Sequence, residues 1–156
     1  MRLALWLVAG LVLAAAAAAA WVRLAPEDPA LWHVDPLTAP DTGRPNAWRV
    51  LPEGGDAVAP VFDLPPVALA ARLDAIALAE PRTRRLAGSP EALHATYVQR
   101  SRLWGFPDYV SVRVLDAGEG RSTLAIFSRA RFGQSDLGVN RARVEKWLAA
   151  LGAPAA

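Results

Sequence analysis

Arginine is the residue type in this chain that offers the clearest route to binding chemistry, because sixteen of its seventeen basic residues are arginine. Residues 82–156 carry twelve basic and six acidic side chains, whereas residues 24–81 carry three basic and nine acidic ones. Guanidinium groups bind phosphates and carboxylates through paired hydrogen bonds. The C-terminal half is therefore a candidate anion-binding surface, although the codon usage of a GC-rich genome would also enrich arginine.

One candidate anion site collects arginines from two predicted strands and the last helix. Because side chains alternate between the two faces of a strand, Arg129 and Arg131 share one face, as do Arg100 and Arg102 on another strand. Arg141 lies about one turn into the last helix, near an N-terminus whose dipole favours anions. An anionic small molecule or a lipid head group would suit such a site. The candidate ligand-binding residues are Arg100, Arg129, Arg131, Asp136, Asn140 and Arg141.

A structural interpretation competes with this site, and it is the one that the sequence favours. Arg129 and Arg131 would pair with Asp136, Asp108 or Glu145 and so tie the last loop to the sheet. An aspartate beside a pair of arginines commonly fixes a turn in this way. Whether the arginines face an open pocket or their own carboxylates separates the two interpretations.

Patterns typical of catalytic and metal sites are missing. The chain has no cysteine, and its two histidines, His33 and His94, stand apart rather than in a cluster that ligates metal. It has no G-x-S-x-G motif and no glycine-rich phosphate loop. We therefore expect no metal and no cofactor, and we favour a non-enzymatic role. A hydrolase that uses Asp136 or Asp108 as a base is the alternative.

The N-terminal segment predicts a membrane helix. Residues 3–22 contain no charged side chain, and a helix of that length spans about 30 Å, the hydrocarbon thickness of a bilayer. The length favours an uncleaved anchor, while the alanines at residues 18–20 would suit a signal peptidase. The positive-inside rule, applied to Arg2 and to the acidic residues after Arg23, places the N-terminus in the cytoplasm. We expect a single-pass protein of the bacterial inner membrane with its C-terminal domain in the periplasm.

The segment 25–62 is predicted to be an extended arm between the membrane helix (1–24) and the domain (63–156). Nine of the thirteen prolines lie between residues 25 and 66, and proline interrupts helices and central strands. Apolar residues such as Trp32 and Trp48 indicate that the arm packs in part against the domain. A short strand is expected at residues 48–51.

The domain itself is predicted to be α+β, with two helices packed on one face of a small antiparallel sheet. The first helix begins at Pro65-Pro66 and stops before Pro81. The last is expected to be capped by Asp136, to carry an apolar stripe from Leu137, and to end at Gly152. Between them, alternating polarity predicts strands at 82–87, 94–103, 109–115 and 121–131, the last two forming a hairpin.

Four segments of the C-terminal half carry a family resemblance. They are residues 97–102 (YVQRSR), 105–108 (GFPD), 128–133 (SRARFG) and 135–141 (SDLGVNR). Over roughly residues 60–151 the chain resembles the domain of unknown function 1499, found in uncharacterised bacterial and plant proteins. The resemblance implies no activity, cofactor or catalytic residue.

Together these features predict a membrane-anchored envelope protein whose domain binds an anionic ligand or a protein partner. A purely structural envelope module is a further alternative. A nucleic-acid partner is not expected, because the excess of positive charge is moderate and no recognition helix stands out.

Overall fold

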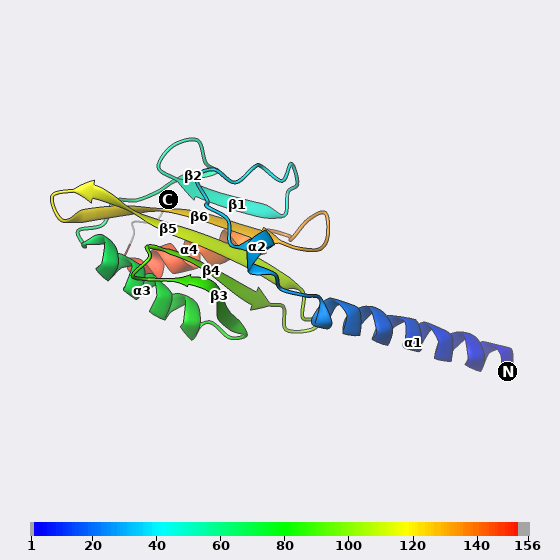
Figure 1. Cartoon of the computed structure of the whole chain (residues 1–156). Coiled ribbons are helices and arrows are strands. Elements are labelled where there is room, and N and C mark those ends of the chain that lie inside the picture. Colours follow the sequence, from blue (N-terminus) through cyan, green and yellow to red (C-terminus); the bar gives the residue numbers. More distant parts are fainter. Residues whose placement is uncertain (1, 153–156) are drawn as a thin grey trace.

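The structure is a computed structural model that describes residues 2–152. One long helix, α1 (Arg2–Leu24), projects from a domain built on a single sheet (Figure 1). The segment Ala4–Leu24 has a mean hydropathy of 2.2 and only 6% of its most apolar stretch is buried. The described part of the chain thus contains one helix that is long and apolar enough to cross a membrane.

The sheet is antiparallel except at one edge. Its strands are β1 (Ala47–Leu51), β2 (Ala57–Val58), β3 (Thr83–Ser89), β4 (His94–Arg100), β5 (Pro107–Gly118) and β6 (Arg121–Ala130). They lie in the order β2-β1-β6-β5-β4-β3, and β1 and β2 form the parallel pair. The strand predicted at residues 48–51 is confirmed as β1. Because β1 pairs with β6, part of the proline-rich segment belongs to the sheet.

The β5–β6 hairpin lies at the centre of the sheet. Its side chains alternate between the two faces of the sheet. Val110 and Val112 of β5 are buried in the hydrophobic core, whereas Tyr109 and Ser111 lie on the opposite face. The predicted hairpin is therefore confirmed; β6 is close to its expected length, whereas β5 is longer than the predicted 109–115 and extends from Pro107 to Gly118. β4 ends at Arg100, earlier than residue 103, because the Ser101 carbonyl accepts a hydrogen bond from the Gly105 N–H and turns the chain.

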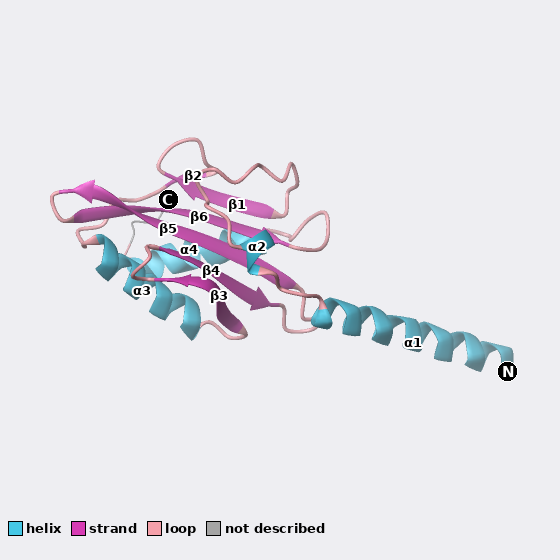
Figure 2. Cartoon of the chain, viewed as in Figure 1, coloured by secondary structure: helices cyan, strands magenta, loops and turns pink. Residues whose placement is uncertain are grey.

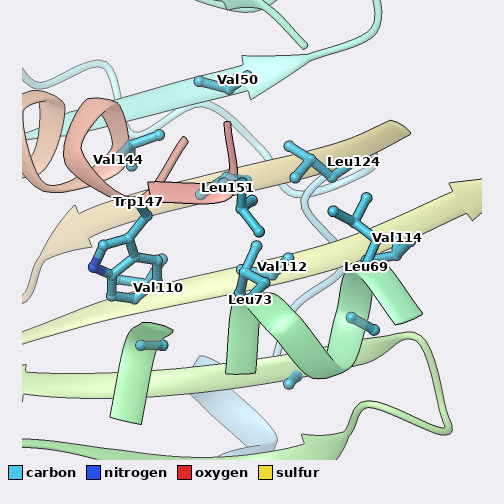
Figure 3. Close-up of a cluster of buried hydrophobic side chains, with 14 of the residues drawn as sticks. Val50, Leu69, Leu73, Val110, Val112, Val114, Leu124, Val144, Trp147 and Leu151 are labelled. Carbon is cyan, nitrogen blue, oxygen red and sulfur yellow. The ribbon is translucent and has the colours of Figure 1, made fainter. Parts of the chain in front are cut away.

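Two helices, α3 (Pro66–Ala79) and α4 (Val139–Leu151), cover the valine face of the sheet (Figure 1). Leu73 of α3 and Trp147 of α4 point toward Val110 and Val112 in the core cluster (Figure 3). Trp147 is fully buried and meets the Tyr97 ring edge-on at 5.8 Å. Burial of each large apolar side chain contributes about 1.5–3 kcal/mol, so this layer is the main source of stability. The predicted α+β fold is confirmed.

The start of α4 differs from the prediction, because its N-cap residue is Gly138 and not Asp136. The helix begins at Val139, after Gly138 in a left-handed conformation (φ 82°), and Leu137 is 94% exposed. The apolar stripe therefore does not include Leu137. The buried face is instead Asn140, Arg143, Val144, Trp147 and Leu151, a spacing of three and four that carries two polar residues into the interior. The predicted end at Gly152 is confirmed, again with positive φ.

The segment that follows α1 crosses the other face of the sheet. It contains one short helix, α2 (Pro29–Trp32), and is otherwise mostly loop until β1 (Figure 2). Trp32 stacks on Tyr109 at 3.9 Å, and its carbonyl accepts a 2.8 Å hydrogen bond from the guanidinium of Arg129. Arg129 is only 5% exposed. Burial, with a smaller effect of the nearby Arg49 charge, lowers the pKa of Arg129 to about 10.

Two stacked histidines hold the next residues of this segment against the sheet. The rings of His33 and His94 stack at 4.0 Å, and His33 Nδ1 shares a 2.8 Å hydrogen bond with the Thr96 hydroxyl. His94 Nε2 contacts the Val34 carbonyl at 3.1 Å. Burial and the neighbouring His94 lower the pKa of His33 from its ordinary 6.5.

Acidification is expected to destabilise this docked segment. The unfolded chain takes up a proton at His33 near pH 6.5, whereas the folded protein does so only at lower pH, so the free energy of unfolding falls as the pH drops below about 6.5. The melting temperature of the full chain in non-ionic detergent should fall between about pH 7.5 and 5.5. The fall should be smaller in His33→Gln; an identical fall in both proteins would contradict this role.

Candidate functional site

A cavity lined by five arginines lies where α1 meets the domain. It has a volume of about 600 Å³, within the range of small-molecule sites. We call it the arginine pocket; it is lined by Arg23, Arg82, Thr83, Arg84, Arg100, Ser101, Arg102 and Gly105. Three separate parts of the chain contribute these residues: the end of α1, the start of β3, and the end of β4 with the loop that follows.

Backbone contacts hold the arginines of the pocket in place. Arg82, with a φ of 59°, donates from Nε to the Arg100 carbonyl at 3.0 Å, which joins the start of β3 to the end of β4. Arg100 in turn donates to the Gly105 carbonyl at 2.8 Å, and Arg23 to the Leu103 carbonyl at 2.9 Å. The loop after β4 is therefore fixed by arginines on two sides.

Gly105 allows α1 to approach this loop closely. Its φ of 74° is left-handed, and a Cβ atom at this position would meet Cγ of Arg23 at 2.9 Å. A larger residue would therefore strain the backbone and also displace the Arg23 side chain. The glycine is what lets the end of α1 and the loop share one wall of the pocket.

The charges around the pocket are unbalanced. Glu27 is buried between Arg84 and Arg100 and forms ion pairs with both. No other carboxylate of residues 2–152 pairs with the five arginines, and Arg102 forms no hydrogen bond or ion pair in this part of the chain. One negative charge thus faces five positive ones. An anion with several oxygen atoms is the ligand that such an arrangement favours.

The six residues proposed from the sequence do not form one cluster. Arg100 lines the arginine pocket. Arg129 and Arg131 lie on the α2 face of the sheet, where they donate to the carbonyls of Trp32 and Pro26, respectively. Asp136, Asn140 and Arg141 gather at the start of α4. Arg102, which shares a strand pattern with Arg100, is the partner in the pocket that the sequence indicated.

A second cavity of similar size, about 600 Å³, contains Asp136 and Arg141. Its charged lining residues are Arg44, Arg49 and Arg141 together with Asp41, Asp56 and Asp136. The positively and negatively charged side chains of this cavity are equal in number. Arg141 forms an ion pair with Glu145 at 2.7 Å and lies over the Trp48 ring. This cavity therefore lacks the excess charge that distinguishes the arginine pocket.

The polar residue that sequence reasoning missed most clearly is Arg143. Its guanidinium lies between α4 and the sheet, 2.6 Å from Asp108 and within hydrogen-bond distance of Gln99, Ser128 and Asn140. Burial raises the pKa of Asp108 despite the opposing charge of Arg143. The three- and four-residue spacing of Asn140, Arg143 and Trp147 was the available signal.

These contacts correct the ion pairs expected from the sequence. Asp108 pairs with Arg143 rather than with Arg129 or Arg131. The Asp136 carboxylate accepts from the backbone N–H groups of Gly138 at 3.0 Å and Asn140 at 2.7 Å. Both carboxylates proposed as a hydrolytic base are thus engaged in structural bonds.

The fold and the pocket together define a small α+β domain carried on one apolar N-terminal helix, with a positively charged pocket where the two meet. The sequence profile of DUF1499, described as a protein of unknown function, matches residues 37–151. The chain belongs to this family. The match begins earlier than the resemblance at residue 60 and includes β1 and β2, in agreement with their place in the sheet. Neither the curated proteins nor the solved structures gave a match.

The contacts of Asp136 predict a structural role that can be measured. Asp136→Ala removes the carboxylate that accepts from the Gly138 and Asn140 N–H groups and from the Asn140 side chain at 2.6 Å, and loss of such bonds at the start of a helix costs about 0.5–2 kcal/mol. The melting temperature should fall by a few degrees, and Asp136→Asn should recover part of the loss. An unchanged or higher melting temperature in the alanine variant would contradict this structural role and make Asp136 a candidate for a functional role again.

Proposed function

We propose that this chain is a membrane-anchored envelope protein whose domain binds a phosphate-bearing anion in the arginine pocket. The observation that carries the proposal is five arginines around one cavity with a single paired carboxylate, Glu27. Phosphate fits this chemistry because it offers several oxygens to more than one guanidinium at once.

The orientation of the chain forms part of the proposal. α1 anchors the protein in the bacterial inner membrane, with its N-terminus in the cytoplasm and the domain in the periplasm. Arg2 and the α-amino group support the cytoplasmic side, and Glu27 and Asp28 follow Arg23 on the other side. The arginines of β3 and β4 lie more than 55 residues beyond α1, too far along the chain to count in that rule.

The Glu27 carboxylate competes with an anionic ligand for the arginines of the pocket. It occupies the space between Arg84 and Arg100, while Arg102 is left without an ion pair among residues 2–152. A phosphate therefore binds first against Arg102 and its neighbours, and gains further contacts where it replaces Glu27. Removal of the Glu27 charge and removal of the Arg102 charge should consequently act in opposite directions.

Thermal stability of the full chain in non-ionic detergent tests the proposal with inorganic phosphate and glycerol 3-phosphate as probes. A ligand at 100 times its dissociation constant stabilises by about 2.7 kcal/mol, so a rise of several degrees in melting temperature is expected at low salt. The rise should shrink at moderate salt, because the pocket is open to screening ions. Arg102→Ala should reduce it, and Glu27→Gln should raise the affinity.

Arg72→Ala is the matched control, because Arg72 is an exposed arginine on α3 and does not line the pocket. It should leave the phosphate effect unchanged. Absence of any stabilisation at low salt would refute the proposal and favour a purely structural module. An equal loss in Arg72→Ala and Arg102→Ala would also refute it, because the effect would then report overall charge.

A further inference from the structure

We infer that the ligand of the arginine pocket is an anionic phospholipid of the same membrane, with its phosphate among the arginines and an acyl chain along α1. This inference rests on the proposed function, since it names the source of the phosphate. Its evidence is an apolar groove that lies beside the arginine pocket, along α1.

This apolar groove has a volume of about 340 Å³ and lies between α1 and the loop after β4. We call it the α1 groove; it is lined by Ala15, Ala18, Ala19, Val22, Trp104 and Phe106. The four α1 residues have the spacing of one helix face, and their small side chains leave room beside the two aromatic rings. All six lining residues are apolar.

The groove and the arginine pocket are lined by residues that are adjacent in the chain. Val22 lines the groove and Arg23 lines the pocket, so adjacent residues of α1 contribute to the two cavities. Gly105 lines the pocket, and its neighbours Trp104 and Phe106 line the groove. A ligand that fills both must therefore have a charged end joined directly to an apolar chain. A phospholipid has this form, whereas a free phosphate fills the pocket alone.

The position of the groove along α1 identifies the membrane as the source of the ligand. Ala15 lies seven residues before Val22, which corresponds to about 10 Å along the helix. Trp104 and Phe106 line a cavity with these alanines, so the loop reaches down the side of a helix that crosses the bilayer. Leu103 at its tip is 72% exposed. An exposed apolar loop in that place belongs in the membrane interface, where tryptophan is favoured.

The charge of the pocket selects among the lipids that the groove admits. A phosphatidylcholine head group carries a cationic choline beside its phosphate, which the five arginines repel. Phosphatidylglycerol carries the phosphate without a cation. The groove adds little affinity inside a bilayer, because lipid tails are as apolar as its walls, so the arginines supply the selectivity.

Lipid retention by the full chain tests the inference. Native mass spectrometry of the protein in non-ionic detergent is carried out with added phosphatidylglycerol or phosphatidylcholine. We expect one phosphatidylglycerol per chain, bound about tenfold more tightly than phosphatidylcholine, and Arg102→Ala should remove most of this difference. The soluble probe glycerol 3-phosphate is measured in parallel by its effect on melting temperature.

Two substitutions on α1 separate the groove from the pocket. Ala19→Phe fills the groove and should weaken retention of phosphatidylglycerol while leaving the effect of glycerol 3-phosphate unchanged. Ala17→Phe, on the opposite side of the helix, is the control and should change neither. Equal retention of the two lipids, or equal effects of the two substitutions, would overturn the lipid inference while the phosphate site stood. Loss of the glycerol 3-phosphate effect in the wild type would instead refute the proposed function.

Discussion

The contact between Arg129 and the carbonyl of Trp32 determines how α1 and the domain are joined. Arg129 is buried on the α2 face of the sheet, and no carboxylate of the described residues pairs with it. A buried guanidinium without hydrogen-bond partners would be costly, so the carbonyl of the arm and the hydroxyl of Ser111 are needed to satisfy it. The arm cannot leave the sheet without exposing this charge and the stacked ring of Tyr109.

This contact has consequences for the candidate site because the arm continues directly from α1. With residues 26–35 held across the sheet, Glu27 lies between Arg84 and Arg100, and the end of α1 lies against Gly105. The arginines of β3 and β4 are thereby brought to the end of α1. A cluster of like charges opposes folding, and Glu27 offsets only part of that repulsion. Such residual imbalance is common at binding sites, where the ligand supplies the missing charge.

The elements of the domain were largely predictable because their signals are local. The alternation of Val110, Val112 and Val114 and the prolines around α3 define a hairpin and a helix without reference to the rest of the chain. The start of α4 was predicted wrongly because Leu137 looked like a core residue. The turn made by the Asp136 carboxylate directs it outward, and Asn140 and Arg143 take the interior positions instead.

The site was predictable only in part because its residues come together through tertiary contacts. Period-two alternation placed Arg100 and Arg102 on one strand face; both line the pocket, although β4 ends at Arg100 and Arg102 lies in the turn that follows. Arg23 could not be joined to them from the sequence, because a proline-rich arm has no periodicity that indicates where it crosses the sheet. The contacts of Arg129 and Arg131 could not be predicted for the same reason. Their carbonyl partners lie in this arm, about one hundred residues away in the chain.

The central claim, that five arginines at the end of α1 bind one phosphate, is tested most directly by nuclear magnetic resonance of the arginine side chains. The full chain, labelled with ¹⁵N-arginine in non-ionic detergent, is titrated with glycerol 3-phosphate. The Nε–H signals of the pocket arginines should shift together with one dissociation constant, while those of the exposed Arg72 and Arg121 stay in place. Shifts spread evenly over all arginines, or no shift in the pocket, would contradict the account.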